Sequence, residues 1–372
     1  MRVLQLTSSS AGGVARHAHQ VADLLARPPR RPGTLQVDEG DQVILAGPPD
    51  VLAGAPVPGA VVDIADRPRP SDVVALARLR RLAAHADVVH AHGLRAGAAA
   101  VLALRTLRDR PALVVTVHNA PVGGAGVRGV AAALERVVAR GADVVLGVSG
   151  DLVERMDALG ARDTERALVP APARRVAPGA APGTATLLAL GLGQGERLVL
   201  TVARLAPQKG LDLLCDASAL VRDRAPGVVR WVVVGDGPLE EHLQARIDAE
   251  RLPVRLAGRR DDVPELLTRA DVVVSTALWE GQPLAVQEAL QAGAAVVATD
   301  VGGTAEVTGD AAVLVPPRAE AIADAVVRVL GDDGERDRLR QAARQRAADL
   351  PGPNDVHRQL RDVYSRALGH RC

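Results

Sequence analysis

Short apolar runs rich in β-branched residues recur along this 372-residue chain, and segments with helical patterns separate them. The first series consists of residues 3–6, 43–45, 61–64, 88–91, 113–117 and 144–148. A second series follows at residues 198–202, 231–234, 254–256, 272–275, 295–298 and 312–315. Strands that alternate with helices are typical of parallel sheets covered on both faces. We therefore predict an α/β protein with two Rossmann-like, doubly wound domains, each binding ligands at the carboxyl ends of its strands.

A proline- and glycine-rich stretch, residues 170–183, separates the two series and has few large apolar side chains. This composition is typical of a linker. The expected parts are a first domain over residues 1–172, a linker region over 173–195 and a second domain over 196–350. A last helix over residues 355–368 follows the break at Pro351 and Pro353, and we expect it to pack back on the first domain.

The composition excludes several classes of protein. With 48% hydrophobic and 24% charged residues the chain is globular, and no window of about 18 apolar residues lacks a charge or a break, so no membrane span is expected. The start of the chain enters a strand without a signal-peptide pattern, and Cys215 and Cys372 form no disulfide framework. A cytoplasmic location is expected.

The charge pattern narrows the partners further. A net charge of +1, one Tyr, two Trp and no Phe disfavour nucleic-acid binding. Arg78, Arg80 and Arg81 fit a solvated helix face and leave open a weak peripheral association with an anionic membrane, at about 1 kcal/mol per basic residue. Among 45 basic residues Lys209 is the single lysine, so its position in the chain is informative.

Two carboxylates eight positions apart, Glu280 and Glu288, flank a glycine turn after the apolar run 271–275. Glu280 is expected on the loop that leaves a strand, and Glu288 about one turn into a helix over residues 284–292. An elongated ligand with hydroxyl groups at each end and phosphate in the middle fits this stretch. The alternative is that both carboxylates only favour the positive end of a helix.

Backbone N–H groups between the two carboxylates are candidate anion donors. A helix start leaves its first N–H groups unpaired and carries partial positive charge. Gly281, Gln282 and Leu284 occupy this position in the sequence. Pro283 has no N–H group but suits a first helical turn.

Other candidate residues of the second domain follow strand ends. Arg204 and Lys209 follow the strand 198–202 and together can neutralise a diphosphate without a metal. Gly235 begins a tight turn after the strand 231–234, and Arg260 follows the next strand. The adjacent Asp261 and Asp262 are better explained as an N-cap of the helix that follows than as metal ligands.

In the first domain, Gly12 and Gly13 follow the first strand and let the backbone approach a ligand at a helix start. The turn lacks the G-x-G-x-x-G pattern of nicotinamide dehydrogenases.

Polar residues also follow three later strands of the first domain. His90 and His92 end the strand 88–91, and His118 ends the strand 113–117. No carboxylate stands at a metal-binding spacing, so no metal site is predicted, and His118 is expected to face the crevice. Ser149 is interpreted as a helix N-cap rather than a nucleophile.

In their order along the chain, these pieces resemble the retaining glycosyltransferases of family 4, which have the GT-B fold. The resemblance spans nearly the whole chain. It rests on Gly12 and Gly13 with His17, His118, Ser149, Arg204 with Lys209, Gly235 with Gly237, and Glu280 with Glu288. The E-x7-E pair with the upstream arginine and lysine is specific, whereas the glycine turns and histidines alone are weak signals.

The resemblance implies transfer of a sugar from a nucleoside-diphosphate donor to an acceptor, with retention at the anomeric carbon and without a metal or other cofactor. It implies that Arg204 and Lys209 bind the diphosphate. Glu288 would accept from the ribose hydroxyls, Glu280 would contact the donor sugar, and His118 would lie near the reacting carbon.

The remaining roles carry over in the same way. Gly281 and Gln282 would offer amides to sugar or phosphate, Gly12 and Gly13 would approach the donor phosphate or the acceptor, and Arg260 would lie near the base. The family commonly has Glu-Gly-Phe-Gly where this chain has Gln282 and Pro283 after Glu280-Gly281. This departure bears on donor geometry and on the identity of the sugar.

Three alternatives to a transferase remain at the level of sequence. They are a GT-B phosphorylase, a sugar-nucleotide epimerase and a non-catalytic nucleotide-sugar-binding protein. The sequence names neither the donor base and sugar, nor the acceptor, nor the oligomeric state.

Overall fold

The computed structural model describes residues 1–8, 13–28, 40–64, 69, 72–119, 125–170, 187–188, 190–193 and 195–370. The chain divides into two compact units: unit 1 comprises Met1–Pro170 with Pro351–Cys372, and unit 2 comprises Ala171–Leu350. Most of the expected linker, residues 173–186, lies outside the described residues. We describe each unit by itself.

Unit 1 is built on a sheet of parallel strands in the order β3-β2-β1-β4-β5-β6-β7. Its strands are β1 (Arg2–Thr7), β2 (Gln42–Gly47), β3 (Gly59–Val61), β4 (Val88–His92), β5 (Ala112–Val117), β6 (Val144–Gly147) and β7 (Thr164–Arg166). The order of the strands reverses between β1 and β4. Such a reversal opens a crevice at the carboxyl ends of the two strands, where doubly wound proteins bind ligands.

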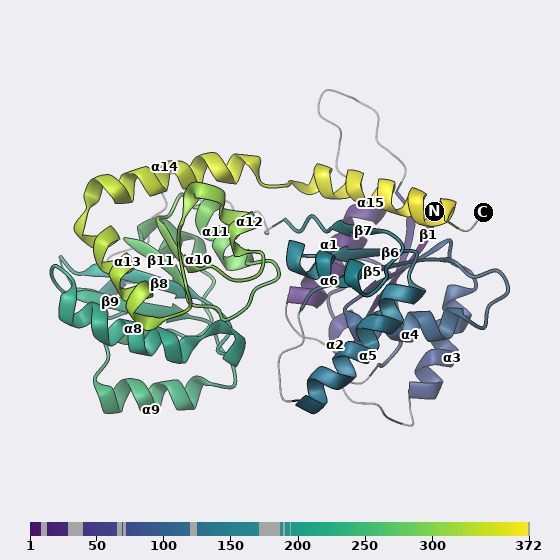
Figure 1. The fold of residues 1–372 in the computed structure, drawn as a ribbon, viewed down its shortest axis with the longest axis horizontal. Coiled ribbons are helices and arrows are strands. Elements are labelled where there is room, and N and C mark those ends of the chain that lie inside the picture. Colours follow the sequence, from purple (N-terminus) through teal and green to yellow (C-terminus); the bar gives the residue numbers. More distant parts are fainter. Residues whose placement is uncertain are drawn as a thin grey trace. The chain divides into compact units, whose positions relative to one another are not determined.

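Helices cover both faces of the unit 1 sheet (Figure 1). They are α1 (Gly13–Ala26), α2 (Pro49–Leu52), α3 (Asp72–Ala83), α4 (Leu94–Leu104), α5 (Ala125–Gly141), α6 (Gly150–Ala158) and α15 (Pro353–Gly369). Helix α15 is the last in the chain, yet it packs against α1, β5 and β6. Its Val363, Tyr364 and Ala367 are fully buried. The periodic apolar face of α15 therefore completes the core of unit 1.

Unit 2 repeats the architecture with the strand order β10-β9-β8-β11-β12-β13, again all parallel. Its strands are β8 (Arg197–Val202), β9 (Val229–Val234), β10 (Val254–Leu256), β11 (Val272–Ser275), β12 (Val296–Thr299) and β13 (Val313–Val315). Here the order reverses between β8 and β11. The ligand-binding edge of this sheet is therefore expected where the loops leave these two strands.

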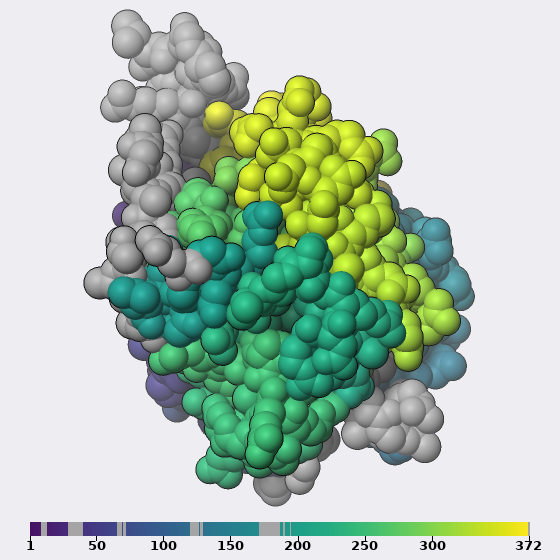
Figure 2. Space-filling view, turned by 90° about the vertical axis from the view of Figure 1, so that its left-hand side faces the viewer, coloured from purple at the N-terminus to yellow at the C-terminus, as the bar shows by residue number. Residues whose placement is uncertain are grey.

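Both faces of the unit 2 sheet are buried by helices. These are α8 (Leu211–Arg224), α9 (Glu240–Glu250), α10 (Val263–Arg269), α11 (Leu284–Gln291), α12 (Thr304–Thr308), α13 (Ala319–Gly331) and α14 (Asp333–Asp349), with short 3-10 turns η1 (Pro207–Lys209) and η2 (Gly309–Ala311). Trp231 and Val233 pack with α8 and α13, which lie side by side in teal and yellow-green (Figure 2). Val232 and Val234 pack with α10 and α11 on the other face. The two-residue period of a strand thus builds two cores from one apolar run.

The expected α/β architecture with two doubly wound sheets is confirmed, and a strand forms at each of the twelve predicted positions. Two details were wrong. Strand β3 ends at Val61, so residues 62–64 lie beyond the strand, although the Val62 N–H still donates to the Gly47 carbonyl at 3.0 Å. Strand β7 was missed because its three residues, Thr164–Arg166, are polar and only partly buried at a sheet edge. In the described part of the chain no helix is long and apolar enough to cross a membrane.

The tetrapeptide Ala-Asp-Val-Val occurs three times, at residues 86–89, 142–145 and 270–273, and each copy begins a strand. Each aspartate accepts a backbone N–H from the start of the neighbouring strand. The pairs are Asp87 with Arg2, Asp143 with Leu113 and Asp271 with Leu198, each at 2.8 Å. An N–H at the amino end of an interior strand thereby gains a charged acceptor, and adjacent strands are held in register.

We expect Asp271→Ala to destabilise unit 2 by about 2–3 kcal/mol, because it leaves the buried Leu198 N–H without its acceptor and removes the nearer of the two carboxylates beside Arg197. Both tryptophans, Trp231 and Trp279, belong to unit 2, so urea denaturation followed by tryptophan fluorescence reports on this unit. The control is Asp223→Ala, which removes an exposed ion pair with Arg222 and should change the midpoint little. Equal effects of the two substitutions would contradict the register role.

Candidate active site

The loops that follow β8 and β11 in unit 2 are locked together through their backbones. Gly210, at a φ of 61°, ends the β8 loop in the left-handed region, and a Cβ there would lie 2.1 Å from the carbonyl oxygen of Thr276. The Thr276 hydroxyl donates to the Lys209 carbonyl at 2.9 Å, and the Leu278 N–H donates to the Gln208 carbonyl at 2.9 Å. Only glycine permits this approach, so the two loops form one surface.

This surface pairs the single lysine of the chain with the first glutamate of the E-x7-E motif. The Lys209 ammonium donates to the Glu280 carboxylate, and the Glu280 side chain is only 10% exposed. The Gly303 N–H also donates to the Glu280 carbonyl at 2.8 Å, which fixes its backbone. The sequence placed both residues at strand ends but did not predict that they bind each other. The ion pair holds this nearly buried carboxylate in one orientation.

Arg204 lies on the same β8 loop but has a different environment. Arg204 is exposed, and it has no ion-pair partner within the described residues. The turn after β9 packs directly against this loop: the Leu205 N–H donates to the Asp236 carbonyl at 2.8 Å. The approach is so close that a Cβ on Gly235 would lie 1.9 Å from the Ala203 carbonyl oxygen. A guanidinium on a fixed loop with no internal carboxylate is suited to an external anion.

The start of α11 differs in one respect from the expectation. The Leu284 N–H, proposed as an anion donor, donates to the Gln282 carbonyl at 2.9 Å and so already has a partner. Pro283 at the helix start turns the backbone and produces this short-range bond. Glu288 lies one turn into α11, is partly buried and also has interaction partners. Gly281 is buried beside Glu280.

Arg260 is engaged by a neighbour in the sequence. Its guanidinium makes two hydrogen bonds of 2.7 Å to the Asp262 carboxylate, and this pairing lowers the pKa of Asp262. Asp262 does occupy the N-cap position of α10, but its side chain makes no capping hydrogen bond. The expected N-cap position is therefore confirmed, while the carboxylate binds Arg260, because a charged guanidinium is a stronger partner than a backbone N–H.

Unit 1 gathers three histidines at the carboxyl ends of β1, β4 and β5. His17 comes from α1, His92 ends β4 and His118 follows β5. The ring centroids are 5.3 Å apart for His17 and His92, 5.0 Å for His17 and His118, and 5.7 Å for His92 and His118. We call these three residues the histidine trio. Gly13 is the first residue of α1, whereas Gly12 lies outside the described residues.

His90 lies on β4 with His92 but is not part of the histidine trio. Its Nδ1 lies 2.8 Å from the Tyr364 hydroxyl and its Nε2 lies 2.7 Å from the Thr116 hydroxyl, so both ring nitrogens are used. The Gln5 amide nitrogen donates to the Tyr364 hydroxyl at 3.0 Å, and His92 Nε2 lies 2.8 Å from the Gln5 amide oxygen. Sequence reasoning missed Gln5 and Tyr364, and their buried polar side chains form the support of the trio.

Burial keeps these imidazoles neutral. It lowers the pKa of His17 to about 4 and, with the neighbouring His17, the pKa of His90 to about 3. The pKa values of His92 and His118 are also lowered, first by burial and then by the other histidines. A charged imidazolium loses its hydration in this environment.

Ser149 lies at the N-cap position of α6, and its hydroxyl donates to the Asp151 carboxylate. It makes no capping hydrogen bond with its side chain. The expected place at the helix start is therefore confirmed, while the hydroxyl is used by a neighbouring side chain.

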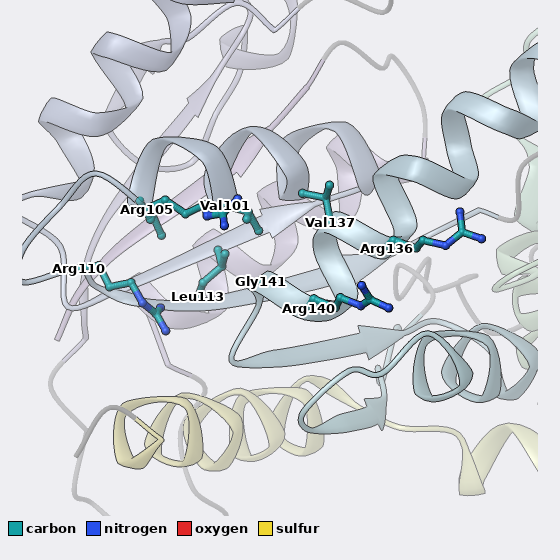
Figure 3. Close-up of a pocket in the computed structure, with 9 residues that line it drawn as sticks. Val101, Arg105, Arg110, Leu113, Arg136, Val137, Arg140 and Gly141 are labelled. Carbon is teal, nitrogen blue, oxygen red and sulfur yellow. The ribbon is translucent and has the colours of Figure 1, made fainter.

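A separate cavity of about 440 Å³ lies in unit 1 between the ends of α4 and α5 (Figure 3). Its floor includes Val101 and Leu113, and its lining contains four arginines: Arg105, Arg110, Arg136 and Arg140. Arg110 is neutralised by Asp143 through two hydrogen bonds of 2.7 Å. The cavity lies at the amino ends of β5 and β6, opposite to the strand ends that carry the histidine trio.

Two α/β units, each built on an all-parallel sheet, define the GT-B fold class. Solved structures share this fold. This chain superposes on HepE from Anabaena with a TM-score of 0.78 at 20% identity, covering 98% of this chain and 100% of HepE. Sucrose-phosphate synthase from Thermosynechococcus elongatus gives 0.78 at 19% identity, covering 99% and 100% of the two chains. At these identities the likeness concerns the fold alone.

Sequence relatives define the family. Residues 7–172 match the glycosyl transferase 4-like domain and residues 189–346 match the glycosyl transferases group 1. D-inositol 3-phosphate glycosyltransferase from Salinispora arenicola is 32% identical over 327 residues, 78% of this chain and 71% of that protein. The chain therefore belongs to the group 1 glycosyltransferases of family 4.

Other relatives match over shorter stretches. A diphosphoundecaprenol-linked α-1,3-galactosyltransferase from Escherichia coli is 33% identical over 31% of this chain and 30% of its own length. Alpha-D-kanosaminyltransferase from Streptomyces kanamyceticus is 32% identical over 41% of this chain and 40% of its own. The chain thus spans less than half of the length of these two relatives.

We expect unit 1 to lose stability steeply as the pH falls below about 6.5. The unfolded chain protonates each histidine near its ordinary pKa of 6.5, whereas native His17 does so only near 4. Between these values the unfolded state binds more protons, so the free energy of unfolding falls by about 1.4 kcal/mol per pH unit for each buried histidine. Urea denaturation with a chelator present, followed by hydrogen exchange of β4 and β5 peptides, measures this slope.

Unit 2 supplies the internal control for this experiment, since its single histidine, His242, is exposed on α9. Its tryptophan-detected unfolding should have a much smaller slope over the same pH range. Equal slopes in both units would show that the buried imidazoles are not the cause.

Proposed function

We propose that this protein transfers a sugar from a nucleoside-diphosphate donor to a hydroxyl group of an acceptor, with retention at the anomeric carbon and without a metal cofactor. The observation that carries the proposal is the surface at the ends of β8 and β11. There Arg204 is an exposed cation on a fixed loop, and Lys209 is paired with Glu280. HepE, which shares the fold, has been solved with UDP and with UDP-glucose, which supports a nucleotide donor.

The two cations bind the donor diphosphate. The planar guanidinium of Arg204 bonds two phosphate oxygens at once, and the Lys209 ammonium adds a compact charge. Negative charge grows on the diphosphate as the bond to the sugar breaks, and both groups stabilise it. Together they replace the divalent cation that a diphosphate leaving group otherwise needs.

The carboxylates hold the ends of the donor. Glu280 accepts hydrogen bonds from sugar hydroxyls while Lys209 holds its carboxylate in place, and Glu288 accepts from the ribose hydroxyls. Gly281 and Gln282 contact the sugar or phosphate through their amides, and Gly235 allows the β9 turn to approach the donor. The guanidinium of Arg260, held by Asp262, lies beside the base.

Unit 1 contributes to the reacting end of the donor. His118 contacts the sugar near the anomeric carbon, and the turn at Gly12 and Gly13 approaches the phosphate or the acceptor. The acceptor oxygen forms a bond to the anomeric carbon on the face that the phosphate leaves, and the bond from that carbon to the phosphate oxygen breaks. The acceptor proton passes to the departing phosphate oxygen. The products are the glycoside and the nucleoside diphosphate.

We expect Lys209→Ala to lower turnover at least about 100-fold, because one preorganised charge that stabilises the leaving group is lost. The measurement is release of nucleoside diphosphate from a panel of UDP-, GDP- and ADP-sugars. Arg259→Ala is the matched control, since Arg259 is 82% exposed and lies 3.7 Å from Asp236. An unchanged rate in Lys209→Ala would remove this residue from the site.

We also expect the effects of Lys209→Ala and Glu280→Gln on kcat/KM to be non-additive, because the two side chains bind each other. The double variant should lose less than the product of the two single losses. A fully multiplicative loss would mean that the pair seen here separates before the donor binds.

Analysis of the reaction products distinguishes a transferase from the three alternative functions. Nucleoside diphosphate with a glycoside supports the proposal. A sugar phosphate would indicate a phosphorylase, an isomerised donor an epimerase, and donor binding without turnover a binding protein.

A further inference from the structure

Among the described residues, three ring nitrogens in the histidine trio have no hydrogen-bond partner. They are Nδ1 of His17, Nδ1 of His92 and Nε2 of His118, and each of these atoms is buried. The trio offers three ligand atoms that all lie within 4.8 Å of one another. Buried polar atoms normally have partners, so three unpartnered nitrogens that converge on one point indicate a missing ligand.

The tautomer of His92 follows from its support. The Gln5 amide nitrogen donates to the Tyr364 hydroxyl, so the Gln5 amide oxygen is left to accept from His92 Nε2. A neutral imidazole that donates from Nε2 carries a lone pair on Nδ1. This lone pair lies within 4.8 Å of the free nitrogens of His17 and His118. It can accept a hydrogen bond or bind a metal ion.

The chemistry of the trio favours a metal ion of borderline softness. Three neutral imidazoles, with one held by an outer amide, form a ligand set of the kind that binds Zn²⁺ and leaves one coordination position open. Hard cations such as Mg²⁺ and Ca²⁺ prefer oxygen ligands, and the trio supplies none. Zn–N bonds of about 2.0–2.1 Å require the three rings to close by roughly 1 Å around the ion.

We propose that His17, His92 and His118 bind one Zn²⁺-like ion, and that the bound ion inhibits the enzyme by withdrawing His118 from the donor sugar. The sequence predicted no metal site because no carboxylate stands at a metal-binding spacing, and nothing along the chain brings His17 of α1 to His92 and His118. Binding of the ion depends on the trio alone. Inhibition rests also on the proposed function, in which transfer itself needs no metal.

The binding test uses the 372-residue chain without an affinity tag, stripped with a chelator and dialysed against micromolar Zn²⁺. Mass spectrometry of the metal should find one Zn²⁺ per chain, and Mg²⁺ should not replace it. His17→Gln and His118→Gln should each weaken binding at least about 10-fold, and Gln5→Leu, which frees the His92 ring, about 10- to 100-fold. His85→Gln is the control, since His85 is exposed and outside the trio.

Folding of each variant is checked by its thermal transition in chelator. His118→Gln is the variant that least affects packing, because His118 is partly exposed whereas His17 and His92 are buried. Zinc binding that is the same in the native chain, His17→Gln and His118→Gln would overturn the proposal. So would fewer than one ion per native chain.

The inhibition test compares donor turnover with and without stoichiometric Zn²⁺. The native chain should lose most of its activity and regain it when chelator is added, while His17→Gln should be much less sensitive. If the enzyme binds one Zn²⁺ in the trio and keeps full turnover, the proposal that the bound ion inhibits transfer is overturned. A chain that binds Zn²⁺ but turns over no nucleotide sugar under any condition would count against the proposed function and leave the metal site standing.

Discussion

Parallel strand pairing is the constraint on which both clusters depend. In each unit all paired strands run in one direction, so every loop that leaves a carboxyl end emerges at the same edge. In unit 2 this brings Lys209 to Glu280 across 71 residues of sequence. In unit 1 it brings His92 and His118 together, and α1 adds His17. Both clusters lie where the strand order reverses, which is the position where the loops part and leave room for a ligand.

The two clusters differ in how their charge is arranged. In unit 2 the exposed Arg204 is left with an uncompensated charge among the described residues, while Lys209 is balanced by Glu280. This combination attracts an anion and also keeps a carboxylate ready for hydroxyl groups. In unit 1 burial keeps the imidazoles of the histidine trio uncharged. Hydrogen bonds connect His92 through Gln5 to Tyr364. The tautomer of His92 thus depends on the last helix of the chain.

The sequence predicted the fold well because local periodicity decides it. Apolar runs of β-branched residues located the strands, and the proline- and glycine-rich stretch separated the two series. Errors occurred where local pattern is weak: β7 is three polar residues at an edge, and the Leu284 amide is used by a bond that the turn at Pro283 makes. Asp262 lies at the predicted N-cap position, but its carboxylate binds Arg260, two residues away, and makes no capping hydrogen bond.

By itself, the sequence determined the two doubly wound sheets and the placing of Arg204, Lys209 and Glu280 at strand ends, since strand period and turn residues are local properties. Only the tertiary structure decided which of these side chains bind each other. It paired Lys209 with Glu280, brought His17 to His92 and His118, and placed Tyr364 against Gln5 across 359 residues. Such partners are set by strand order and by the return of α15, and no spacing along the chain encodes them.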